Sequence, residues 1–162
     1  MRLARFVTYL SDLISSTPNP AVSGVTGYAG TNDTPVGLQV SFSTGASIVL
    51  GSVRTAASGG DSADSTERII EGEPPQQTDV PAFDLDRQKI SVKQFETWIA
   101  ALITNSKNTE VESVRPIQGG THRYGLDVAF HSGAHIYVYF TYTLAPGKQP
   151  GSHPPYQGVE AI

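Results

Sequence analysis

The sequence contains no cysteine, one methionine and one tryptophan, and only 16% of its 162 residues are charged. The lack of cysteine excludes disulfide bonds, cysteine-ligated zinc and thiol nucleophiles, and it leaves the redox compartment open. No apolar run approaches the ~18 residues that a membrane helix needs, so we expect no contact with a membrane. The start at Met1–Arg5 is basic, but polar Thr8 and Ser11 follow it, which favours a cytoplasmic protein over a secreted one.

The chain is acidic, with a net charge of −4, and the acid is concentrated in one segment. Residues 61–86 have a net charge of −7, so the rest of the chain sums to +3. Phosphate binding requires clustered lysine and arginine, and the overall acidity therefore argues against a nucleic-acid partner. The segment carries one base, Arg68, and eight acids: Asp61, Asp64, Glu67, Glu71, Glu73, Asp79, Asp84 and Asp86.

An internal repeat is the most informative feature of the sequence. Residues 37–50 match residues 125–138 at an offset of 88, with seven of fourteen positions identical. Upstream the offset becomes 89, and eight further identical pairs follow in order, the first of them Phe6 with Phe95. This ordered series predicts a duplicated unit rather than chance agreement between two amphipathic segments.

Each copy shows the same hydrophobic periods. Apolar residues recur at three- and four-residue steps over 3–14 and over 95–103, which predicts an amphipathic helix in each copy. A short strand follows each helix, and then a hairpin in which apolar and polar residues alternate. The hairpin turn is predicted at residues 44–46, with Ser43 opposite Ser47, because glycine suits the left-handed position of a three-residue turn.

Each unit is therefore α-β-β-β and has about 55 residues, too few to bury its apolar face alone. We predict one α+β domain, in which two internally duplicated α-β-β-β units form a pseudo-twofold structure with an antiparallel sheet and two helices. The predicted segments are the first repeat at 1–56, an acidic Pro/Gly-rich strap at 57–89, the second repeat at 90–144 and a Pro/Gly-rich extended tail at 145–162.

We expect the tail or the strap to be ordered mainly by other chains, and ordering by its own domain is the alternative for the tail. Proline denies the tail its own ladder hydrogen bonds, and the charge of −7 at 61–86 opposes collapse of the strap on itself. A disordered linker is the alternative for the strap. The apolar pairs Ile69-Ile70 and Phe83-Leu85 favour partial order, since a disordered linker would leave them exposed to water.

The sequence contains none of the common catalytic motifs. There is no phosphate-binding glycine loop, nucleophile elbow or metalloprotease spacing. The hairpin register places His131 opposite His135, with their side chains about 5 Å apart. A zinc site needs a third ligand, and Asp127 lies two pairs away. We therefore predict no metal, no cofactor and no catalytic residue.

The same outward face carries Tyr137 and Tyr139. Amphipathic aromatic side chains are favoured at interfaces. This face is either covered by the strap or the tail, or it is a surface for a partner, and the sequence leaves both open. The candidate partner surface consists of His131, His135, Tyr137 and Tyr139.

With a strand at 82–89, the module layout resembles the β-α-β-β-β modules of the vicinal oxygen chelate family. That resemblance implies a glyoxalase-like metalloenzyme that holds a metal with His and Glu. No matching pair of inward His and Glu residues can be placed on symmetric strands of the two copies. This metalloenzyme is therefore the least favoured alternative.

A second resemblance rests on three features: the chain lacks catalytic motifs, and it has an acidic strap and a proline-rich tail. In overall style it is similar to small virion proteins of tailed bacteriophages, such as capsid decoration, minor capsid and head-to-tail joining subunits. This implies a non-enzymatic structural protein that contacts other chains of a symmetric assembly. It would be made in the bacterial host cytoplasm and located in the virion.

An immunity or inhibitor protein is the other alternative, in which the acidic segment mimics a nucleic acid against a basic partner. Stoichiometry distinguishes the two. An inhibitor binds one to one, whereas a shell or tail protein is present in many symmetric copies.

Overall fold

Two helices and six strands follow one another in the computed structural model, which describes residues 1–30, 36–56, 66–83, 89–117 and 122–162. The first half supplies one helix and three strands, and the second half repeats that order. This confirms the prediction of an α+β fold with two helices. The elements are α1 (Leu3–Ser16), β1 (Val22–Tyr28), β2 (Val36–Phe42), β3 (Ser47–Thr55), α2 (Val92–Asn105), β4 (Val111–Pro116), β5 (Gly125–Phe130) and β6 (His135–Leu144).

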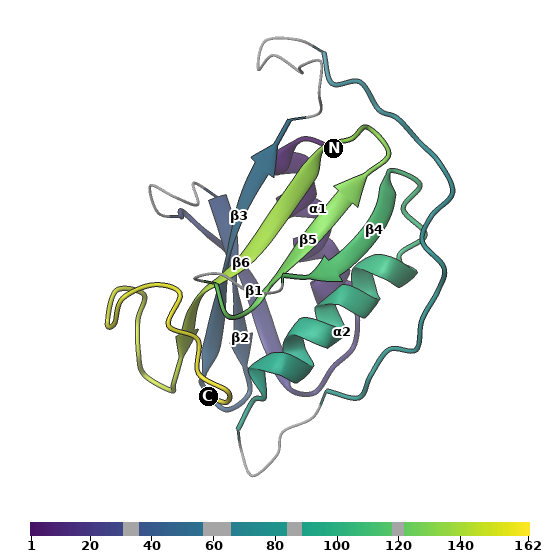
Figure 1. Cartoon of the computed structure of the whole chain (residues 1–162). Helices are drawn as coiled ribbons and strands as arrows, with labels where there is room; N and C mark the ends of the chain where they lie inside the picture. Colours follow the sequence, from purple (N-terminus) through teal and green to yellow (C-terminus); the bar gives the residue numbers. More distant parts are fainter. Residues whose placement is uncertain (31–35, 57–65, 84–88, 118–121) are drawn as a thin grey trace.

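The six strands form one antiparallel sheet in the order β1-β2-β3-β6-β5-β4 (Figure 1). The two halves meet at its centre, where β3 pairs with β6 from Ser47 opposite Leu144 to Thr55 opposite His135. This arrangement leaves β1 and β4, the first strand of each half, at the two edges of the sheet.

The halves also correspond in individual hydrogen bonds. The N–H of Phe42 donates to the carbonyl of Ala46 over 2.9 Å, and Phe130 donates to Ala134 over 3.0 Å. Both edge strands contain a bulge near their first residue. These pairs are related by the offsets of 88 and 89 found in the sequence. The two halves therefore correspond in structure. That they arose by duplication stays a prediction.

One core lies between the sheet and the helices and contains residues of both halves. Helix α1 contacts β1, β2 and β3, whereas α2 contacts β4 and β5. Two edge-to-face ring pairs cross between the halves: Phe6 of α1 packs on Phe130 of β5, and Phe95 of α2 packs on Phe42 of β2. The centroid distances are 6.1 and 5.2 Å.

The hairpin turns use glycine as predicted but close one residue earlier. Gly45 and Gly133 have φ of 84° and 77°, in the left-handed region. Phe42 pairs with Ala46, however, so the loop is 43–45 and Ser43 does not oppose Ser47. Phe42 and Ile48 face the core in either register, so the alternation of apolar and polar residues does not distinguish the two registers.

The strap is ordered along residues 66–83 by contacts within the chain. It passes outside β4 and α2, at the right of Figure 1. The N–H of Gly72 donates to Thr109 over 2.8 Å, and Thr78 exchanges hydrogen bonds with the side chain of Asn105. Phe83 is 2% exposed and packs in the core. Most of the strand considered at 82–89 lies outside the described residues.

The tail also folds back on its own chain. Its last residues pair with the segment before α2, since Ile162 exchanges two backbone hydrogen bonds with Ile90 and is 8% exposed. We expected other chains to order the tail or the strap, with the tail's own domain as the alternative, and in the described residues both segments contact their own domain. All four tail prolines precede residue 156, so the N–H groups needed for pairing at the end of the tail are present.

Within the parts of the chain that the structure describes, neither helix combines the length and the apolar character that a membrane crossing requires.

Candidate functional site

A row of aromatic rings lies on the outer face of β6. His135, Tyr137 and Tyr139 point away from the core because their neighbours Ile136, Val138 and Phe140 are buried in it. The His135 and Tyr137 rings stack with 6.1 Å between centroids, and Tyr137 stacks on Tyr139 at 6.1 Å. Three of the four residues of the predicted partner surface are thus adjacent.

Two residues that the sequence did not single out extend this row. The ring of His122 lies 4.1 Å from that of Tyr139 and 4.4 Å from that of Tyr156. Tyr156 reaches the row from the tail, where its N–H donates to the carbonyl of Thr141 over 2.8 Å. We call the five rings of His122, His135, Tyr137, Tyr139 and Tyr156 the ring ladder.

The tail covers only one end of the ring ladder. Both strands beside β6 place a glycine opposite Tyr139, Gly51 on β3 and Gly125 on β5. Neither neighbouring strand thus places a side chain opposite Tyr139, and the rings of His122 and Tyr156 pack against its ring. At the other end the His135 side chain is 40% exposed. The sequence left open whether a segment of the chain or a partner covers this face, and the structure shows coverage by the tail at Tyr139.

The surroundings of Tyr139 keep its phenol protonated. Burial raises the pKa of Tyr139, and the nearby Tyr137, Tyr156 and Asp127 raise it further. Asp127 and Nδ1 of His135 share a hydrogen bond of 2.8 Å, diagonally across β5 and β6. Nδ1 of His122 is buried and has no hydrogen-bond partner among the described residues. The surface thus offers ring faces with hydroxyl groups at their edges.

His131 does not lie opposite His135 as predicted. His135 pairs with Ala129, and His131 lies in the turn, where its Nε2 is 2.9 Å from the carbonyl oxygen of Glu73 in the strap. The earlier turn closure accounts for this separation. Across the described ranges, no three His, Cys, Asp or Glu side chains are grouped as metal ligands would be.

An ion cluster fastens the strap to the start of α1. The Arg5 guanidinium bonds the carboxylate of Glu67 at 2.8 Å and that of Glu110 at 2.5 Å. The Arg5 hydrogen bonds hold the pKa of Glu67 below its ordinary value, against the effect of burial. The Arg5 pKa is raised by the same carboxylates. With every group of this cluster paired, we assign it to strap attachment.

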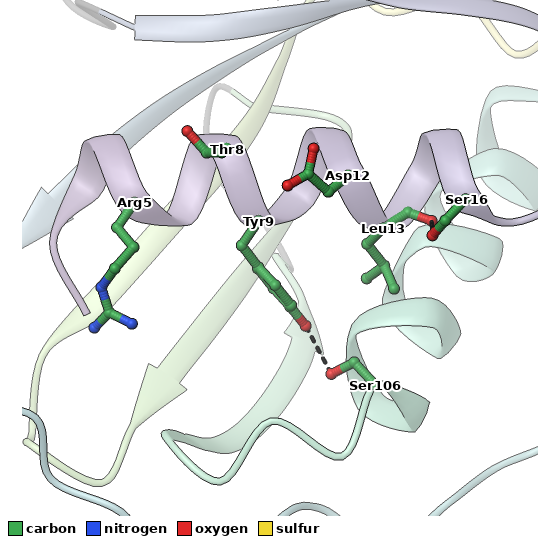
Figure 2. Close-up of a pocket in the computed structure, with 7 residues that line it drawn as sticks. All are labelled: Arg5, Thr8, Tyr9, Asp12, Leu13, Ser16 and Ser106. Carbon is green, nitrogen blue, oxygen red and sulfur yellow. Dashed lines mark hydrogen bonds between the residues drawn. The ribbon is translucent and has the colours of Figure 1, made fainter.

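A shallow pocket of about 610 Å³ lies along α1 and is lined by residues such as Arg5, Leu13 and Ser106. Figure 2 shows the Tyr9 hydroxyl pointing across it to the Ser106 hydroxyl, 2.7 Å away. Burial raises the pKa of Tyr9. The pocket thus holds a protonated phenol in a structural hydrogen bond, and no nucleophile and base are paired among the residues that line it.

Comparisons with known proteins returned no match to a family model, to a curated protein or to a solved structure.

Proposed function

We propose that this chain is a non-enzymatic structural protein that acts through contacts with other protein chains, and that the ring ladder is its contact surface. The observation that carries the proposal is the half-buried row of rings on the outer sheet face. Tyrosine and histidine supply large contact areas, and tyrosine loses little side-chain entropy on binding. The fixed sheet beneath the rings sets their spacing before a partner arrives.

The assembly that we propose is a bacteriophage virion. The resemblance in composition to capsid decoration, minor capsid and head-to-tail joining subunits supports this setting. The partners would be other capsid or tail chains, and the chain would be made in the host cytoplasm before incorporation.

The inhibitor alternative receives less support from the acidic strap. Glu67 binds Arg5, and the Glu71 carboxylate accepts a hydrogen bond from Thr109 over 2.7 Å. These two acids are turned towards their own domain, so a basic partner would have to displace both contacts.

The proposal is tested by comparing the wild-type chain with a Tyr137→Ser variant in cells that carry its gene in the native setting. Particles are isolated on a density gradient, and the copies of the chain per particle are counted by mass spectrometry. Wild-type protein should be present in many symmetric copies, and the variant should fall at least about tenfold in occupancy.

A Tyr9→Phe variant is the matched control, because it alters a tyrosine of the α1 pocket and leaves the outer face unchanged. Circular dichroism establishes that both variants are folded. A soluble one-to-one complex in place of particles would contradict the proposal, and so would undiminished incorporation of folded Tyr137→Ser protein.

A further inference from the structure

Strand β1 is an open edge of the sheet. It pairs with β2 on one side, and the sheet order places no strand on its other side. Ser23, Thr26 and Gly27 are exposed. An open depression of about 320 Å³ lies beside the strand and is lined by Ser23, Gly24 and Val25 together with the end of α1. The edge is therefore accessible in the part of the chain that the structure describes.

The opposite edge strand, β4, is protected against pairing, and β1 is not. At an offset of 89, Glu112, Arg115 and Pro116 of β4 take the places of Ser23, Thr26 and Gly27 in β1. Charged residues and proline on an edge strand are devices that block pairing with another chain. Both strands carry a bulge at the same end, so the bulge does not account for the difference.

The sequence of β1 and of the residues next to it in the chain is also free of charge. Residues 13–32 contain no Asp, Glu, Lys, Arg or His. Depletion of charged residues marks the core of protein interfaces. The chain has a net charge of −4, and a segment without charged side chains brings no like charges together when two copies meet there.

The backbone of β1 presents hydrogen-bonding groups to the open side. At the end of β4 the N–H of Ile117 donates to the carbonyl of Gly125 over 2.8 Å. Hydrogen-bonded and non-hydrogen-bonded pairs alternate along an antiparallel ladder, so the preceding pair, Pro116 with Leu126, is a non-hydrogen-bonded pair. Proline fits there because its nitrogen faces away from β5. The corresponding residue of β1 is Gly27, whose N–H therefore faces outward, as does that of Val25 two residues earlier.

We propose that β1 pairs in antiparallel fashion with β1 of a second copy, which joins two six-stranded sheets across a twofold axis. An isologous interface brings a surface against itself, and an uncharged edge can do this without opposing like charges. A different partner would be selected through complementary charge, which β1 does not carry. The inference deepens the proposed function by naming one partner, and it depends on a surface separate from the ring ladder.

The outward-facing groups define the register of this interface. Hydrogen-bonded pairing of Val25 with Gly27 of the second copy places the two Thr26 side chains directly opposite each other. Residues so placed have Cβ atoms about 4.5–5.5 Å apart, and like charges there destabilise the pair. Thr26 is exposed in the single chain, so its substitution leaves the fold intact.

Sedimentation over a concentration series tests the proposal with purified full-length protein. Wild-type protein should form dimers, and Thr26→Arg, which copies the residue of β4, should raise the dimer dissociation constant at least about tenfold. Thr97→Arg is the matched control, since Thr97 is an exposed residue of α2 and the charge change is the same. Monomeric wild-type protein up to about 1 mM would overturn the proposal, as would equal dimerisation of the Thr26→Arg and Thr97→Arg variants.

Cysteine cross-linking supplies a second measurement, because the natural chain contains no cysteine. Thr26→Cys should give a disulfide-linked dimer under mild oxidation, since the expected Cβ separation is close to the ~3.5–4.5 Å of a disulfide. Thr97→Cys should not, and equal cross-linking of the two would contradict the register. Tyr137→Ser protein should dimerise like wild type. Wild-type protein that stays monomeric but is incorporated normally into particles would overturn this inference and leave the proposed function standing.

Discussion

The Glu96 side chain of α2 lies in the protein interior, where 1% of the residue is exposed. Its Oε1 accepts the N–H of Gly125 over 2.8 Å, and its other oxygen is paired with Lys93. The corresponding residue of the first half, at an offset of 89, is Val7. Glu96 therefore fixes α2 to the start of β5 through an interaction that the first half lacks.

Glu96→Leu should lower the free energy of unfolding by about 1–3 kcal/mol, because it leaves the buried N–H of Gly125 without an acceptor. Glu96→Gln keeps an acceptor oxygen and should cost less than the leucine variant. Urea denaturation of the two variants measures the difference. Equal losses would show that the hydrogen bond to Gly125 contributes nothing measurable to stability.

Among the elements, the strap depends on a titratable contact. The Arg5 hydrogen bonds lower the pKa of Glu67 from its ordinary value of 4.5. The ionised carboxylate is therefore favoured by folding, and its contribution is fully present above pH about 4.5. It is lost as the pH falls through the lowered pKa.

Acidification should thus release the strap before the domain unfolds. Hydrogen exchange at the N–H of Gly72, which bonds Thr109, should become faster below pH about 4.5 relative to core amides. Glu67→Gln should show fast exchange already at pH 7 and a flatter pH dependence. Asp79→Asn, a change at an exposed acid of the same segment, is the control. If Glu67→Gln protein showed the same exchange rate at Gly72 as wild type, the ion pair with Arg5 would not be what attaches the strap.

Hydrophobic periodicity predicted the helices, the hairpins and the buried face of each, because burial of one face of an element imposes that periodicity on its sequence. It did not determine the register of the turns, because Phe42 and Ile48 share a face in either register. The same limit misplaced His131. His122 and Tyr156 could not be predicted as parts of the ring ladder, since both come from irregular segments whose contacts leave no period in the sequence.

The path of the tail could not be predicted from the sequence pattern either. Pro146-Gly147 and Pro150-Gly151 each occupy the centre of a turn, closed by Lys148 on Ala145 and Ser152 on Gln149. Both glycines have positive φ, as the third position of a type II turn requires. Composition indicated turns, but the direction in which they return the chain to β6 depends on tertiary contacts.

At the scale of the whole molecule, the two halves share one hydrophobic core. Strand β3 has β2 on one side and β6 on the other, so separating the halves exposes an edge at the centre of the sheet. The crossed pairs Phe6 on Phe130 and Phe95 on Phe42 would lose their partners at the same time. A half-sized unit of one helix and three strands cannot bury enough apolar surface to offset the entropy of folding.

Residues 1–56 and residues 66–162, produced as separate chains, should therefore each lack a cooperative unfolding transition. Mixed in equal amounts they should regain one, because the β3–β6 ladder and both ring pairs form again. Near-ultraviolet circular dichroism of Trp98, which stacks on Phe95 in the core, reports the recovery. Phe42→Ala in the first fragment should weaken the association, since Phe95 of the other fragment then packs against a cavity. An independently folded 1–56 fragment would show that the halves are separate domains and would contradict the single core.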